Sequence, residues 1–135
     1  MKKLILFAGL TLSKACLAGS LLVHTQSWHT GSGFNNENYG AAYCTDESYC
    51  IGTYRNSYKN QTIYAIKDFY SENVFGFVAG VANGYNLKNP HKVQFIAALS
   101  LNTKIDEHWS TKLLVQPAIK SSDASVIHLV VKISF

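Results

Sequence analysis

The chain has 135 residues and a formal net charge of +4; 15% of its residues are charged and 47% are hydrophobic. This composition is too apolar for a disordered protein, and the length suits one domain. Lys2, Lys3 and Lys14 carry much of the excess charge, and without residues 1–18 nine Lys and Arg face eight Asp and Glu. Since this balance leaves no basic patch, we do not expect nucleic acid as a partner.

The first eighteen residues have the pattern of a secretory signal peptide. Lys2 and Lys3 precede the apolar run 4–12, and Cys16-Leu17-Ala18 supplies small residues for a cleavage near Ala18. The apolar run is too short to span a bilayer as a helix. The sequence therefore predicts a signal peptide at 1–18 and one domain at 19–135.

The last eleven residues alternate with a period of two, which predicts a β-strand. Ile127, Leu129 and Val131 share a face with the terminal Phe135, whereas His128 and Lys132 lie on the opposite face. A soluble barrel or sandwich would bury the apolar face against protein, and an outer-membrane barrel would turn it toward lipid. A final aromatic residue in the outward phase favours lipid.

Seven further stretches before this one have strand character and are joined by turn-forming residues. The predicted strands are 20–28, 39–44, 50–56, 62–70, 75–85, 93–103, 108–116 and 125–135. An even number of short antiparallel strands closes most simply as an up-and-down barrel. We therefore predict an all-β, eight-stranded transmembrane β-barrel of the bacterial outer membrane.

The same alternation predicts which side chains point into the barrel. In the first strand the inward residues are Leu22, His24 and Gln26. Lys112 and Lys132 also fall on the inward phase and need carboxylate partners, for which Asp68 and Glu107 are the candidates. A polar lower interior would confine any acyl pocket to the upper half of the barrel, near Gly80 and Ala82.

Cys44 and Cys50 flank the five polar residues of a predicted hairpin tip. In a chain exported to an oxidising compartment, this arrangement predicts a disulfide. A metal-binding pair would need further Cys or His nearby, and none lies within ten residues. We expect no metal and no cofactor.

A serine and a histidine are predicted at the same rim of the barrel. His29 ends the first strand, and Asn56 and Ser57 end the third. Ser and His form a nucleophile and base pair in many acyl-transfer sites, although chance also brings such residues together. His24 is the alternative base, if the register of the first strand is shifted.

Several short motifs resemble, in order, those of the outer-membrane lipid A palmitoyltransferases. Tyr54-Arg55-Asn56-Ser57-Tyr58 is similar to the segment that carries the catalytic aspartate and serine of that family. Trp28-His29, the Asn36-Glu37 pair and a glycine at position 40 resemble its Trp-His, Asn-Glu and glycine-rich strand. The segment 76–82, Pro117 and the final Phe135 also match in position.

The resemblance implies an enzyme that moves an acyl chain from a phospholipid to lipid A at the outer leaflet. His29 would then stand for the family histidine and Ser57 for its serine, and outer-membrane lipids would be the partners of a monomer. Asn56 stands where the family has aspartate, and an amide cannot balance an imidazolium charge as a carboxylate does. Either transfer to lipid A or simple hydrolysis would use these groups.

Two other functions remain open at this point. A related barrel without catalysis could act through its extracellular loops, as a binding or exclusion factor or as a small porin-like structure. A soluble periplasmic calyx could instead bind an apolar ligand. Asn56 and the inward lysines favour the first of these alternatives, and the outward apolar rows disfavour the second.

Overall fold

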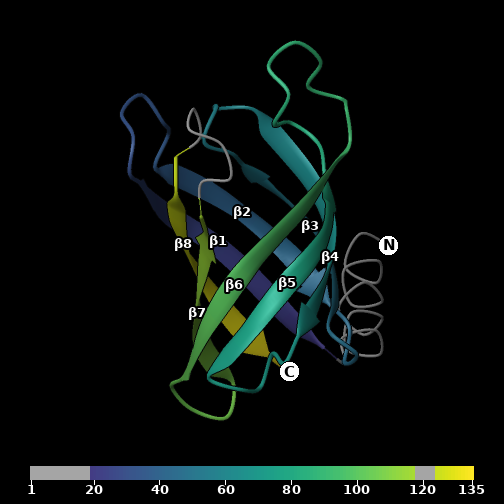
Figure 1. The fold of residues 1–135 in the computed structure, drawn as a ribbon. Helices are drawn as coiled ribbons and strands as arrows, with labels where there is room; N and C mark the ends of the chain where they lie inside the picture. The colour runs from purple at the N-terminus through teal and green to yellow at the C-terminus, as the bar shows by residue number, and fades with distance from the viewer. Residues whose placement is uncertain (1–18, 118–123) are drawn as a thin grey trace, which may run out of the picture.

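A computed structural model describes residues 19–117 and 124–135, which form one closed barrel of eight antiparallel strands (Figure 1). Each strand pairs with the next in the chain, and β1 pairs with β8 to close the barrel. The strands are β1 (Ser20–His29), β2 (Glu37–Cys44), β3 (Tyr49–Arg55), β4 (Gln61–Phe69), β5 (Phe75–Ala82), β6 (Gln94–Lys104), β7 (Trp109–Gln116) and β8 (Val126–Ser134).

The all-β, eight-stranded barrel predicted from the sequence is confirmed. One boundary differs clearly, because β5 ends at Ala82 whereas the prediction extended it to Tyr85. Gly84 has a φ of 86°, a left-handed conformation that takes the chain out of the ladder. The predicted signal peptide lies outside the described residues. Within 19–117 and 124–135 there is no helix long and apolar enough to cross a bilayer.

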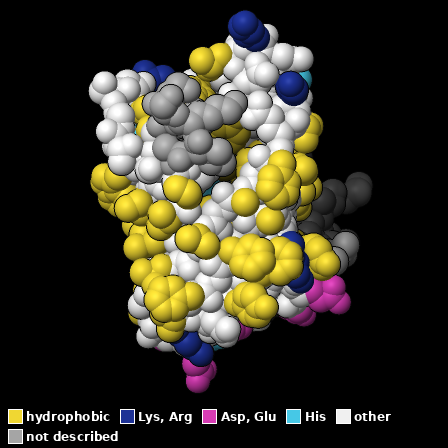
Figure 2. Space-filling view, viewed as in Figure 1, with side chains coloured by type: hydrophobic (Ala, Val, Ile, Leu, Met, Phe, Trp, Pro, Cys, Tyr) yellow, Lys and Arg dark blue, Asp and Glu magenta, His cyan; other side chains and the backbone are white. Residues whose placement is uncertain are grey.

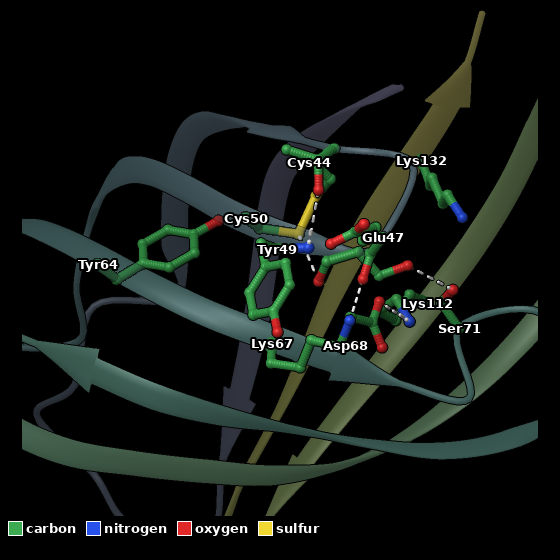
Figure 3. The surroundings of a disulfide bond; sticks show 12 residues. Cys44, Glu47, Tyr49, Cys50, Tyr64, Lys67, Asp68, Ser71, Lys112 and Lys132 are labelled. Carbon is green, nitrogen blue, oxygen red and sulfur yellow. Dashed lines mark hydrogen bonds and ion pairs between the residues drawn. A yellow bond between two sulfur atoms is a disulfide. The ribbon is translucent and has the colours of Figure 1, made fainter. Parts of the chain in front are cut away.

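The barrel has two different ends. Loops 30–36, 56–60 and 83–93 form the upper rim in Figure 1, and three short turns form the lower end. The predicted pair Cys44 and Cys50 is joined by a disulfide with a Cα separation of 4.0 Å, in the turn between β2 and β3 (Figure 3). At this end the backbone N–H of Phe135 donates to the carbonyl of Gly19 at 3.0 Å.

The outer surface of the barrel is apolar. Phe75 is 76% exposed and Phe95 is 75% exposed, and both point away from the interior. Figure 2 shows hydrophobic side chains spread over the middle of the visible face, while Asp and Glu lie in its lower part. Trp28 and Tyr39 near the upper rim, with Trp109 at the lower end, add large aromatic side chains at both borders.

A β-bulge in β1 changes the predicted pattern of inward residues. His24 pairs with Val130 of β8, but the next pair is Gln26 with Leu129, so Thr25 is an extra residue. His24 and Ser27 are therefore buried while Gln26 is exposed. The prediction that Gln26 points inward is wrong, because alternation alone does not reveal the inserted residue.

The lower interior is polar, as the inward lysines predicted. Lys112 pairs with Asp68 at 2.8 Å, and Lys132 pairs with Glu72 at 2.8 Å. Of the two predicted partners, Asp68 is the one that is used, whereas Glu72 takes the place expected for Glu107. The hydrogen bond from Lys132 lowers the pKa of the exposed Glu72 carboxyl. We call the barrel interior the lumen. Lys112 and Asp68 are buried in its lower part, whereas Lys132 reaches the exposed Glu72 at its lower end.

Candidate functional site

Ser57 and His29 meet at the upper rim. The Nε2 atom of His29 lies 2.6 Å from the Oγ atom of Ser57, a hydrogen-bonding distance. His29 is the last residue of β1, and Ser57 follows β3 after Asn56. Because the bulge at Thr25 reverses the phase of β1, His29 lies on the inward side, where Ser57 can reach it. The two residues predicted as base and nucleophile are thus brought together.

Asn36 supplies a third group in line with this pair. Its Oδ1 atom lies 2.8 Å from Nδ1 of His29. Since an amide oxygen only accepts hydrogen bonds, Nδ1 carries the proton and Nε2 is left free to accept from the Ser57 hydroxyl. Ser57, His29 and Asn36 therefore form a serine–histidine–amide arrangement, related by its geometry to the Cys-His-Asn sites of some proteases.

The loop that carries Asn36 also touches both members of the pair. Phe34 stacks on the His29 ring with a centroid separation of 4.7 Å and an interplanar angle of 16°. The backbone N–H of Asn35 donates to the Ser57 carbonyl at 2.8 Å. Three consecutive residues thus contact the imidazole or the serine backbone, which limits the movement of one relative to the other.

Asn56 has a different place from the one the resemblance implied. Its side chain is fully buried, and its Nδ2 atom donates to the Thr62 hydroxyl at 2.9 Å and to the Gly84 carbonyl at 2.8 Å. Its Oδ1 atom accepts from the backbone N–H groups of Tyr58 and Asn60. All these bonds hold the turn that presents Ser57. The hydrogen bond of the His29 Nδ1–H group is accepted by Asn36, not by Asn56.

His24, the alternative base, belongs to a separate cluster within the lumen. Its ring bonds to His128 at 3.2 Å and to the Tyr64 hydroxyl at 2.5 Å, and it stacks on Tyr54. Both ring nitrogens of His24 are therefore occupied by groups other than Ser57. Of the two histidines, the geometry supports His29 as the partner of the serine.

Ser57 lies where two cavities meet. One cavity lies at the mouth of the barrel, and a second cavity continues from it into the lumen. Ser57, Tyr85 and Gln116 line both of them. Burial raises the pKa of Tyr85, so its hydroxyl stays protonated at neutral pH. The serine is thus accessible from outside and from the lumen.

Beside this site, the described ladder between β6 and β7 is shorter than β6 itself. In the described part of the chain, β6 pairs with β7 only from Leu99 and Val115 downward, although β6 begins at Gln94. Pro117 follows β7 and has no N–H with which to extend the ladder. The outward side chain of Phe95 lines the mouth cavity together with the inward Ser57. Among the described residues, the mouth cavity therefore borders the stretch of β6 that has no partner in β7.

Some features of this site carried a sequence signal and others carried none. Asn36 stands in the sequence only as part of an ordered motif, and nothing in the sequence connects it with His29. Within 19–117 and 124–135, His, Cys, Asp and Glu form no group of three or more that could hold a metal ion.

No protein-family model matches the chain, and no curated protein matches it significantly.

Proposed function

We propose that this protein is an outer-membrane barrel that transfers or hydrolyses a lipid acyl chain, with Ser57 as nucleophile and His29 as base. The observation that carries the proposal is the continuous hydrogen-bonded series from Ser57 through His29 to Asn36. It lies at the junction of a mouth cavity and a lumen cavity. Asn36, rather than Asn56, then takes the role of the group that orients the imidazole.

The membrane location is supported by the outer surface. A soluble protein rarely exposes a contiguous apolar surface as extensive as this one, and such a surface marks contact with a membrane or another protein. The lower border carries Trp109 and Tyr70, and the upper one carries Trp28 and Tyr39, as expected for aromatic girdles at the two interfaces. In this orientation the site lies level with the outer leaflet.

The chemistry follows from the hydrogen bonds. The Ser57 oxygen attacks the ester carbonyl of a lipid while His29 Nε2 takes the hydroxyl proton. His29 then returns this proton to the departing alcohol, which leaves an acyl group on Ser57. A hydroxyl of an acceptor, or water, then attacks the acyl carbon and gives its proton to His29. His29 passes this proton to the Ser57 oxygen as the bond between that oxygen and the acyl carbon breaks, which restores the serine. Asn36 holds the Nδ1 proton throughout and keeps the imidazole oriented.

The cavities provide places for the two parts of a lipid. The unpaired start of β6 and Ser57 line the same mouth cavity, and a lipid of the outer leaflet would enter beside β6 to reach the serine without leaving the membrane. Its acyl chain would enter the lumen cavity, where Ile66, Val78 and Leu114 contribute to an apolar wall. The motif resemblance to lipid A palmitoyltransferases makes lipid A the proposed acceptor.

The test is mass spectrometry of lipid A and phospholipids from cells that express the wild type, Ser57→Ala or an empty vector. We expect an acyl group to be added or removed with the wild type alone. Ser32→Ala is a matched control, because Ser32 is an exposed serine in the neighbouring loop of the upper rim, and it should behave as the wild type. An identical lipid profile in all strains, with the barrel folded in the outer membrane, would exclude the proposed transfer or hydrolysis of an acyl chain.

The second candidate is a barrel without catalysis that acts through its upper loops. It is favoured by the neutral Asn36, which does not stabilise an imidazolium by charge, and by the buried ion pair of Lys112 and Asp68 that occupies the lower lumen. In that case substitution of residues in the loop 83–93 would alter surface binding while Ser57→Ala would change nothing.

A further inference from the structure

The lumen cavity that begins at Ser57 ends on a polar floor. Asp68 and Lys112 line this cavity and form an ion pair between Oδ2 and Nζ at 2.8 Å (Figure 3). Lys112 Nζ also donates to Asn102 Oδ1 at 2.7 Å. The backbone N–H of Asp68 donates to the carbonyl of Ser48, in the turn closed by the disulfide. The floor is therefore held together by β4, β6, β7 and the turn between β2 and β3.

Two polar atoms of this floor have no hydrogen-bond partner among the residues that the structure describes. They are Oδ1 of Asp68 and Oγ of Ser100, and both side chains are at least nine-tenths buried. Ser100 is on the inward phase of β6, two residues beyond Ala98, which lines the cavity. A buried carboxylate oxygen without a donor is unfavourable, so this position calls for a hydrogen-bond donor from a ligand or a solvent molecule.

The position of Asp68 tells which part of a bound chain would reach it. The turn that carries Ser57 is bonded to Thr62, and Asp68 lies six residues farther down β4, about 20 Å along the strand. A chain with its carbonyl at Ser57 would therefore bring its far end, not its middle, to the floor. Leu22, Ile66 and Val78 also line this cavity, and their apolar side chains suit methylene groups.

We infer that the lumen selects acyl chains that carry a hydroxyl group at their distal end, with Asp68 Oδ1 as the acceptor of that hydroxyl. The inference rests on the proposed function, since it takes an acyl chain as the occupant of the lumen. A plain alkyl chain would leave the carboxylate oxygen unpaired, whereas a hydroxylated chain would pair it. A site built around a hydroxyl discriminates strongly against analogues that lack it.

The experiment is a binding competition, so that it does not depend on turnover. Purified Ser57→Ala barrel in detergent is mixed with equal amounts of a fatty acid and its terminally hydroxylated analogue, across a series of chain lengths, and bound species are counted by native mass spectrometry. We expect the hydroxylated acid to be favoured by about tenfold or more at the best length. Equal binding, or no binding of either acid, would overturn the inference and leave the floor to water alone.

Two paired substitutions in the same background sharpen the result. The double substitution Asp68→Leu with Lys112→Met replaces the buried ion pair by apolar groups, and such a replacement is often neutral for stability. It should abolish or reverse the preference for the hydroxylated acid. Glu72→Gln with Lys132→Gln alters the other ion pair and should leave the preference unchanged. An unchanged preference in the first pair would overturn the role of Asp68. A strong preference for the hydroxylated acid, together with a wild type that never transfers or hydrolyses an acyl group, would refute the proposed catalysis. The binding site for the hydroxyl would still stand.

Discussion

Asn36 is a neutral residue in a position where serine enzymes commonly have a carboxylate. Its Oδ1 atom orients the His29 ring but adds little charge stabilisation when the imidazole takes a proton. A site of this kind retains the tautomer and loses part of the electrostatic benefit. The expected activity is therefore low but not absent, and it should respond to charge at position 36.

Substitutions at Asn36 test this reasoning directly. Asn36→Asp should raise kcat for ester hydrolysis, because a carboxylate would accept the Nδ1 hydrogen bond and stabilise the imidazolium. Asn36→Ala should lower kcat by about ten- to a hundredfold through loss of orientation. Steady-state hydrolysis of a soluble acyl ester in detergent measures both effects. A kcat that is the same in all three proteins would contradict the role of Asn36.

The corresponding change at Asn56 should act on stability. The resemblance alone predicts that Asn56→Asp preserves or raises activity, because it restores the family aspartate. In the structure, Nδ2 of Asn56 donates to Thr62 and to the Gly84 carbonyl, and a carboxylate would lose both bonds. We expect Asn56→Asp to reduce the free energy of unfolding by about 1–3 kcal/mol. Urea unfolding in lipid vesicles, followed by tryptophan fluorescence, measures the loss.

At the scale of the elements, the site depends on which way the side chains of β1 alternate. Residues 26–29 already pair in order with Leu129 to Val126, so deletion of Thr25 would remove only the extra residue and leave Ser27 and His29 facing inward. We expect this protein to keep its β circular dichroism and its activity. Deletion of Thr25 together with Gln26 would reverse the alternation, turn His29 outward and abolish activity as completely as Ser57→Ala. An active double-deletion protein would show that the inward position of His29 is not needed.

The disulfide between β2 and β3 has a modest expected effect. It closes a small loop, for which the chain-entropy estimate is about 2 kcal/mol. Cys44→Ser with Cys50→Ser should lower the free energy of unfolding by that amount. Urea unfolding under oxidising and reducing conditions gives the value, and reduction should change the wild type but not the double variant. Equal thiol labelling of the wild type before and after reduction would contradict the disulfide.

The sequence predicts the strands well and the site only in part. Alternation in β8 and β6 is long and regular, and the burial of Lys112 with Asp68 follows from the same phase. The bulge at Thr25 has no local signature, since its sequence differs little from a regular strand. The contact of Asn36 with His29 depends on how a loop folds back, and a period of two holds no information about that.

At the scale of the whole molecule, the apolar outer surface must be covered by lipid or detergent. We expect the protein to be recovered in the outer-membrane fraction and to need detergent for extraction. On denaturing electrophoresis, an unheated sample that contains the folded barrel should also migrate differently from a boiled sample. Ser57→Ala should fractionate identically, since Ser57 lies away from the outer surface. Recovery from the soluble periplasm without detergent would refute the membrane assignment.

The pairing of β1 with β8 has a consequence for assembly. Its partners are between 97 and 114 residues apart in the sequence, from His29 with Val126 to Ser20 with Ser134, so the closing contacts are among the most non-local in the chain. Until β8 has been added, β1 and β7 both present open edges that could pair with other chains. We therefore expect the unclosed intermediate to be the species most prone to aggregate, and a chaperone that covers these two edges would help the barrel most at its final step.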